Sequence, residues 1–204
     1  MPVMLTNVSS ILYHDNDITV FMNPIPPFDD HGLLPWDASA TLEELRRSHL
    51  VTGHGVGSPT WNQAWRRDLV ERLEKVFNLF ICVGGIDEFW IDGSFVEKVD
   101  RPTDIDVYFT LYDPLEWLTL PGRLKALEGE NLWTWDPARR RVYPGFIHPK
   151  PPFWGRYRVD IFPDFGRPSG IFDANGGPMT FSQAFRRQRR TFRRKGIVRL
   201  RRYS

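Results

Sequence analysis

Asp104 and Asp106, two aspartates separated by one apolar residue, have the spacing in this chain that best suits chemistry. They open a predicted strand. Because side chains alternate along a strand, both carboxylates point to one face while Ile105 and Val107 point to the core. Two carboxylates so close repel each other, and a fold keeps them most readily with a cation between them. Mg²⁺ typically binds through one or two carboxylates together with substrate phosphates, so the pair predicts a metal and nucleotide site.

A glycine and a serine, Gly93 and Ser94, precede this pair and follow a short apolar strand over residues 89–91. Glycine lets the backbone approach a phosphate closely, and a serine hydroxyl with free amides at a helix start can hold phosphate oxygens. Lys98, in the spacer before Asp104, is a candidate to neutralise a triphosphate, with a solvated loop lysine as the alternative. The segment therefore predicts the phosphate-binding half of the site.

This arrangement resembles the signature of the DNA polymerase beta-like nucleotidyltransferases. That signature is Gly-Gly or Gly-Ser, a spacer about as long as the one between Ser94 and Asp104, and then Asp-apolar-Asp/Glu-apolar. The resemblance covers about residues 60–165. One departure is Asp92, where the family usually has an apolar residue before the glycine. The Asp92 carboxylate would make the pocket more negative.

Members of this family also need a third carboxylate on a later strand. Asp160 lies in the run Arg158-Val159-Asp160-Ile161-Phe162 and is the candidate, with Asp164 and Asp173 as alternatives. Only the fold decides whether Asp160 shares a face with the first two aspartates.

The resemblance implies an α+β fold, a small mixed nucleotidyltransferase-type sheet flanked by helices. It also implies a Mg²⁺-dependent enzyme, with Mn²⁺ as a substitute, that transfers a nucleoside monophosphate from a nucleoside triphosphate to an RNA, protein or small-molecule hydroxyl. The metal ligands and catalytic residues would be Asp104, Asp106 and Asp160, and the nucleotide-binding residues Gly93, Ser94 and Lys98. The small size resembles minimal, stand-alone members found in toxin–antitoxin or phage-defence settings. Nucleotide and acceptor stay open.

The C-terminal segment carries an excess of positive charge. Residues 186–204 hold ten Lys or Arg and no acid, whereas residues 1–185 hold 17 basic and 25 acidic residues. Arginine clusters bind phosphates in a salt-dependent way; a charged helix covering an acidic body is the alternative. Candidate contacts to nucleic acid or an acidic protein are Arg186, Arg187, Arg190, Arg193 and Arg194. They support a second hypothesis, a non-catalytic module that keeps the fold and binds such a partner.

Capping residues and apolar spacing predict the other elements. Thr41 and Glu44 have capping-box spacing for a helix over about 41–50, and Ser58-Pro59 begins a helix over about 59–80. Further elements are a helix over about 114–128 capped by Asp113 and interrupted at Pro121-Gly122, a hairpin over 131–143, a third strand over about 156–162, a basic helix over 180–194 and a short strand over 197–200.

These elements predict one structural domain. Residues 1–57 form an N-terminal extension packing on the core, 58–179 a nucleotidyltransferase-like core, and 180–204 a basic C-terminal helix and tail. The composition, 41% hydrophobic and 25% charged, is that of a soluble globular protein. No run of 18 apolar residues and no signal segment are present, which predicts a cytoplasmic protein without a membrane partner. The oligomeric state stays open.

Overall fold

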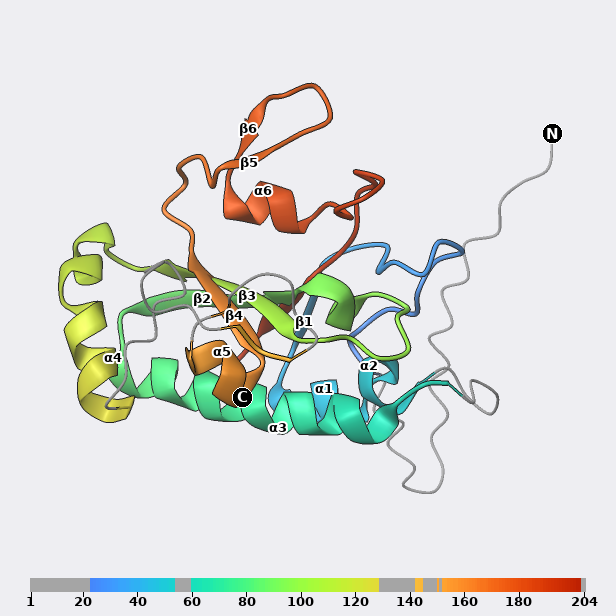
Figure 1. Ribbon diagram of the computed structural model, residues 1–204, viewed down its shortest axis with the longest axis horizontal. Coiled ribbons are helices and arrows are strands. Elements are labelled where there is room, and N and C mark those ends of the chain that lie inside the picture. Colours follow the sequence, from blue (N-terminus) through green and yellow to red (C-terminus); the bar gives the residue numbers. More distant parts are fainter. Residues whose placement is uncertain (1–22, 54–59, 129–141, 145–149, 151, 203–204) are drawn as a thin grey trace, which may run out of the picture.

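A five-stranded mixed sheet organises the protein, which a computed structural model describes for residues 23–53, 60–128, 142–144, 150 and 152–202 (Figure 1). The strand order is β1-β7-β2-β3-β4. The strands are β1 Ala38–Ala40, β2 Ile86–Asp92, β3 Ile105–Leu111, β4 Val159–Pro163 and β7 Val198–Leu200. The pairs β1/β7 and β3/β4 are parallel, whereas β7/β2 and β2/β3 are antiparallel. The predicted α+β fold with a mixed sheet flanked by helices is confirmed.

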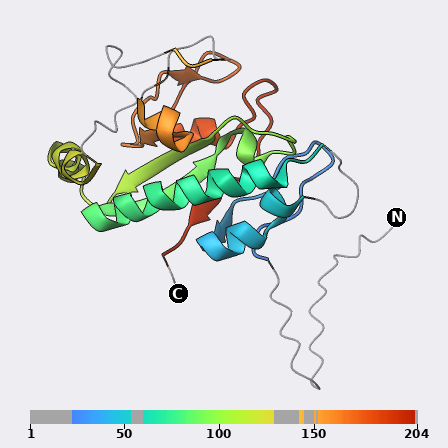
Figure 2. The same cartoon turned by 60° about the horizontal axis from the view of Figure 1, so that its bottom comes forward.

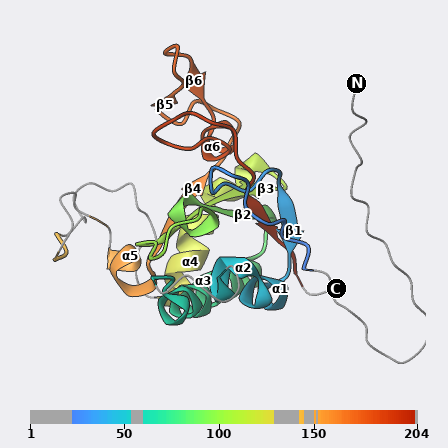
Figure 3. The same ribbon diagram turned by 90° about the vertical axis from the view of Figure 1, so that its right-hand side faces the viewer.

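Helices α1 Leu42–Arg47, α2 His49–Thr52 and α3 Gln63–Val83 cover one face of the sheet (Figure 3). Figure 2 shows α3 lying along the sheet with α1 and α2 beside it. Its apolar stripe is buried, and the ring of Phe80 packs edge-on against Phe89 of β2 and Phe109 of β3. The short helices η1 Gly93–Val96 and η2 Pro114–Leu118 and the helices α4 Leu120–Glu128 and α5 Pro152–Tyr157 complete this part of the chain.

The opposite face of the sheet carries α6 Phe181–Phe185 and a two-stranded sheet of β5 Ile171–Phe172 and β6 Pro178–Met179 (Figures 1 and 3). A smaller apolar cluster lies beneath them, in which Phe185 packs on Tyr108 of β3. One sheet face therefore builds the main core, and the other is only partly covered.

The capping predictions hold where the structure describes them. Thr41 accepts a hydrogen bond from the Glu44 amide and Glu44 accepts one from the Thr41 amide, which makes the predicted capping box of α1. Asp113 caps the next predicted helix as expected, but that helix divides into η2 and α4 at Thr119, two residues before Pro121.

The predicted start of α3 was wrong. Its N-cap is Asn62, whose side chain accepts from the Trp65 amide, and the helix begins at Gln63 rather than at residue 59. Ser58 and Pro59 lie outside the described residues, as do residues 131–141 of the hairpin predicted over 131–143, with the arginines of its turn.

The predicted strand over 156–162 begins three residues late. Residues up to Tyr157 belong to α5 because Phe153, Trp154 and Tyr157 have helical spacing and are all buried. Arg158 then turns the chain with φ of 56°, and β4 starts at Val159.

The predicted basic helix over 180–194 is also wrong beyond its first turn. Thr180 caps α6 in a capping box with Gln183, but the helix ends at Phe185. A longer α6 would bring arginines that are three and four residues apart next to one another on the helix surface. Like charges at that spacing destabilise a helix. The chain instead folds back, and the Lys195 amide donates to the Arg186 carbonyl. The short strand predicted over 197–200 is confirmed as β7.

The N-terminal segment takes part in the sheet itself. Residues 38–40 form β1, whose register with β7 pairs Ala38 with Val198, and Leu42 and Leu45 of α1 are buried in the main core.

None of the helices in the described part of the chain has both the length and the apolar composition needed to cross a membrane.

Candidate active site

Three aspartates lie in register across the adjacent strands β2, β3 and β4. Asp106 is paired with Asp92 on one side and with Asp160 on the other. Paired residues share a sheet face, so the three carboxylates lie on the side that α6 partly covers. Asp104 immediately precedes β3. Asp92, Asp104 and Asp160 are only 5%, 8% and 6% exposed, whereas Asp106 is open in part to solvent. The fold therefore brings together all three predicted catalytic residues.

Asp106 experiences the charges of its neighbours. Burial raises the pKa of its carboxyl well above the usual range, and the charges of Asp104, Asp160 and Asp92 raise it further, while Lys150 opposes them. Since like charges disfavour ionisation, the cluster is short of positive charge. Such a cluster attracts cations.

A lysine that the sequence analysis did not select lies among these carboxylates. Lys150 makes an ion pair with Asp160, and its Nζ lies 3.6 Å from Asp104 Oδ2. It is flanked by Pro149 and Pro151 in the sequence, and a lysine between prolines is the one local signal that could have marked it.

Asp104 is held in place by two donors. Trp154 Nε1 donates to its Oδ2 over 2.7 Å and Thr103 Oγ1 to its Oδ1 over 2.9 Å. Trp154 is fully buried in α5, so this helix positions a carboxylate of the site. No sequence signal marked Trp154, because its partner lies 50 residues away.

Gly93 and Ser94 begin η1 directly beside Asp106. Gly93 has φ of 80°, and a Cβ atom there would collide with Asp106 Oδ2 and lie 3.1 Å from Asp106 Cγ. Only glycine fits, for both reasons. The partly exposed Ser94 hydroxyl makes no hydrogen bond with the described residues. The glycine-serine segment therefore lies directly against the carboxylates.

Lys98 makes no ion pair with the site carboxylates in the part of the chain that the structure describes. Lys98 is exposed, and its amide donates to the Gly32 carbonyl. The other lysine at the site is Lys195, which is buried and makes ion pairs of 2.8 Å with Asp92 and 2.6 Å with Glu97. Burial raises the pKa of Asp92, and Lys195 opposes that shift. The unusual charge at Asp92 thus has its own partner.

Arg66 of α3 holds the spacer between Ser94 and Asp104. Its fully buried guanidinium lies 3.9 Å over the Trp61 ring. It donates to the carbonyl oxygens of Leu50, Phe95, Glu97 and Val99. Burial lowers the pKa of Arg66 to about 9, and Asp100 opposes the shift. Because the buried guanidinium needs these carbonyl oxygens as partners, the hydrogen bonds fix the path of the spacer.

The two alternative carboxylates have other partners. Asp164 accepts hydrogen bonds from the amides of Gly166 and Ser182. Asp173 accepts from the amides of Asn175 and Gly177 in the turn between β5 and β6. Both organise loops, whereas Asp160 is the residue in register with Asp106.

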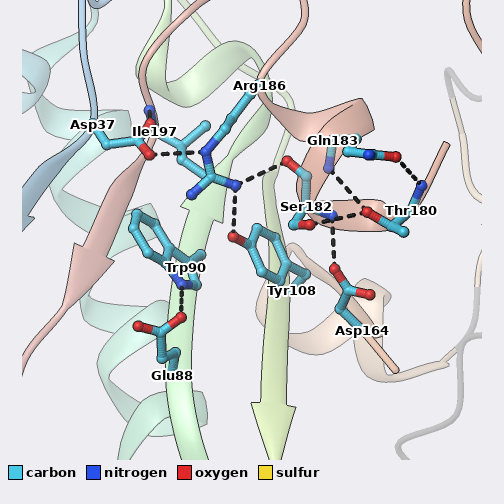
Figure 4. A network of polar contacts seen from close by, with 10 residues as sticks. All are labelled: Asp37, Glu88, Trp90, Tyr108, Asp164, Thr180, Ser182, Gln183, Arg186 and Ile197. Atoms are coloured by element: carbon cyan, nitrogen blue, oxygen red, sulfur yellow. Dashed lines mark hydrogen bonds and ion pairs between the residues drawn. The ribbon is translucent and has the colours of Figure 1, made fainter. Parts of the chain in front are cut away.

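Arg186, predicted to bind an anionic partner, is held by contacts within the chain (Figure 4). Its Nε donates to Asp37 over 2.8 Å and its Nη1 to the Tyr108 hydroxyl over 2.9 Å and the Ser182 carbonyl over 2.8 Å. The guanidinium lies 4.7 Å over the Trp90 ring. The other predicted arginines, Arg187, Arg190, Arg193 and Arg194, are exposed.

As the side chains lie, the described residues contain no group of three or more His, Cys, Asp or Glu placed to hold a metal ion. At the carboxylates, Trp154 donates to one oxygen of Asp104 and Lys150 pairs with one oxygen of Asp160. A metal ion would require Lys150 to move.

Comparison with known proteins gives one match. Neither the curated proteins nor the solved structures contain a match to this chain. A family model described as a family of unknown function, DUF6932, matches residues 26–201, which include every strand of the sheet and every residue of the candidate site. The chain belongs to the DUF6932 family.

Proposed function

We propose that this protein is a metal-dependent nucleotidyltransferase that transfers a nucleoside monophosphate from a nucleoside triphosphate to a hydroxyl group. The observation that carries the proposal is the register of Asp106 with Asp160, beside Gly93 and Ser94. It places the carboxylates and the glycine-serine turn at one point on one sheet face.

The residues fit a divalent cation in charge and donor type. The like charges of Asp104, Asp160 and Asp92 raise the pKa of Asp106 beyond the effect of burial, so a cation would relieve their repulsion. Asp104, Asp106 and Asp160 would hold Mg²⁺ or Mn²⁺ through oxygen ligands. The ion supplies neutralisation of charge on the triphosphate.

The protein's own residues do the rest. The Gly93 backbone lets the triphosphate approach, and the Ser94 hydroxyl holds a phosphate oxygen. Lys150 releases Asp160 and neutralises the phosphates, the role that the sequence suggested for Lys98. The acceptor oxygen attacks the α-phosphorus, the bond to the bridging oxygen of the β-phosphate breaks, pyrophosphate leaves, and Asp160 takes the hydroxyl proton.

The test uses purified protein with Mg²⁺ or Mn²⁺ and each of four α-labelled ribonucleoside triphosphates, with total RNA and cell lysate as acceptors. We expect label on an acceptor with the native protein and with Asp173→Asn, a control carboxylate outside the site. Asp106→Asn should abolish labelling while the protein stays folded. Equal labelling by Asp106→Asn would refute the proposal.

A second candidate function is a non-catalytic module with this fold that binds an anionic partner. One observation favours it: the cation between Asp104 and Asp160 is the protein's own Lys150. A built-in counter-ion makes a metal unnecessary. This function predicts no labelling and no Mg²⁺ binding by calorimetry, whereas the first predicts Mg²⁺ binding that Asp106→Asn weakens at least tenfold.

A further inference from the structure

The chain between α6 and β7 folds back on itself in a short loop. The Gln188 amide donates to the Arg193 carbonyl over 2.8 Å, and Arg187 and Arg194 pair as an antiparallel bridge. We call residues 187–194 the arginine loop. Its exposed arginines are Arg187, Arg189, Arg190, Arg193 and Arg194.

The charge of the arginine loop has no acidic partner in the described residues, where none of its five arginines makes an ion pair. The basic residues on either side do: Arg186 pairs with Asp37, Lys195 with Asp92 and Glu97, and Arg199 with Glu88. The acidic body therefore neutralises the flanks and leaves the loop positive. Five like charges without an acidic partner among the described residues repel one another in so short a loop, and a bound polyanion would relieve this repulsion.

The base of the arginine loop is fixed beside the carboxylates. Lys195, just after the loop, pairs with Asp92, which is in register with Asp106. Gln188 donates to Glu97, three residues after Ser94. On the other side of the loop, the Arg186 network ties it to β2 and β3 (Figure 4). A polyanion on the loop would lie next to the proposed site of transfer.

An exposed aromatic residue lies at the same base. The chain at Trp36 packs against Gly196, where a Cβ atom would collide with the Trp36 carbonyl and lie 2.9 Å from the Asp37 amide nitrogen. The Trp36 residue is 62% exposed, although its neighbours Leu34 and Gly196 are buried. An exposed indole offers a face on which an unpaired base can stack, and in a duplex those faces are already stacked.

From these observations we propose that the arginine loop and Trp36 bind a single-stranded nucleic acid, and that its terminal hydroxyl is the acceptor. The guanidinium groups contact successive phosphates, since their planar forks match phosphate oxygens. The acceptor role rests on the proposed nucleotidyltransferase function, whereas binding of the strand does not.

The test measures fluorescence anisotropy of labelled single-stranded RNA, single-stranded DNA, duplex and polyglutamate over a range of salt concentrations. The loop variant is Arg189→Gln/Arg190→Gln/Arg193→Gln. The control is Arg47→Gln/Arg67→Gln/Arg167→Gln, which removes the same charge from exposed sites elsewhere. We expect the loop variant to lose at least tenfold in affinity for single strands and the control less than twofold. The slope of log affinity against log salt should become shallower by about 2, since each lost phosphate contact removes about 0.7.

Trp36→Ala should also reduce single-strand affinity roughly tenfold, the usual cost of losing one stacked base, with little change in the salt dependence. Comparison of RNA with DNA identifies the sugar. Equal losses in the loop variant and the control would overturn the proposal, as would preferred binding of the duplex or of polyglutamate.

Transfer to the bound strand is then tested with α-labelled nucleoside triphosphates. Label on its terminus supports the acceptor role. Binding through the loop without label there, but with label on another acceptor, overturns that role and leaves the proposed function standing. Binding through the loop with no label on any acceptor leaves the binding surface in place and counts against the proposed function itself.

Discussion

Asp106 illustrates how a single carboxylate sets function against stability. Burial and three neighbouring carboxylates raise its pKa well above that of an unfolded chain, about 3.9. Between the unfolded and the folded pKa, the folded state holds more protons, so the free energy of unfolding falls as pH rises through that window. The penalty on the folded state is therefore larger at neutral pH than near the unfolded pKa.

Asp106→Asn should therefore raise the melting temperature near neutral pH, and its advantage should shrink as the pH falls towards about 4. Mg²⁺ should raise the melting temperature of the native protein more than that of the variant, which binds the ion more weakly. Thermal unfolding at both pH values, with and without Mg²⁺, checks this. A variant less stable than the native protein at neutral pH would contradict the electrostatic account.

Gly93 separates the effect of backbone strain from that of a collision. Gly93→Ala adds a Cβ at φ of 80° and against the Asp106 carboxylate, whereas Gly170→Ala adds one at φ of 83° with open space around it. Strain alone costs about 1–2 kcal/mol, which both variants should lose. Gly93→Ala should in addition lose transfer activity and Mg²⁺ binding. Chemical denaturation and labelling assays compare the two; equal activity would show that Asp106 can move aside.

Most of the site residues that sequence reasoning reached lie in a local pattern, whereas Asp160 was reached through the resemblance to a family that needs a third carboxylate on a later strand. Asp104, Asp106, Gly93 and Ser94 lie within one strand-turn-strand segment, and alternation along the strand was enough to place them together. Lys150 and Trp154, which donates to Asp104, come from segments with no pattern of their own. Their positions depend on how β4 pairs with β3, which spacing along the chain does not encode.

At the scale of elements, Arg66 fixes the spacer that joins η1 to β3. Arg66→Met would take the side-chain donor away from the carbonyl oxygens of Leu50, Phe95 and Val99, while the Glu97 carbonyl keeps the Val99 amide. Each unsatisfied buried group costs about 1–3 kcal/mol, so a loss on the order of 3 kcal/mol or more is expected. Arg66→Lys keeps the charge but cannot span four acceptors, and should fall between. Denaturant unfolding measures these losses.

The neighbouring Arg67 provides the control, because it is exposed on the same turn of α3. Arg67→Met should change stability by less than about 0.5 kcal/mol. A similar loss in both variants would mean that helix propensity, not the hydrogen bonds to the spacer, governs the effect.

Element boundaries follow from capping chemistry where the caps are local. Thr41 and Asp113 were predicted correctly because each side chain bonds an amide only two or three residues away. The C-terminal helix was not, because apolar residues at Phe181 and Phe185 fit a helix while the arginines after them repel along it. The start of β4 was misplaced because aromatic packing extends α5 to Tyr157.

At the scale of the whole molecule, the C-terminal strand β7 lies inside the sheet, between β1 and β2. The two ends of the described chain thus meet in one sheet, with β1 near the start and β7 near the end. Sequence order could not reveal this, since β7 is short and follows a charged loop. The arginine loop is consequently not a detachable tail.

Shortening the chain after Lys195 should abolish folding. It removes Ile197, Val198 and Leu200, which are 0%, 0% and 5% exposed, and the hydrogen bonds to both neighbouring strands. Burying each such side chain contributes about 1.5–3 kcal/mol, so their sum rivals the net stability of about 5–15 kcal/mol of a typical domain. Shortening after Arg202 keeps β7 and should leave unfolding unchanged. Circular dichroism and thermal melts compare the two variants. A cooperative melt of the chain that ends at Lys195 would mean that β7 is dispensable, and deletion of the arginine loop together with β7 could then test the loop directly.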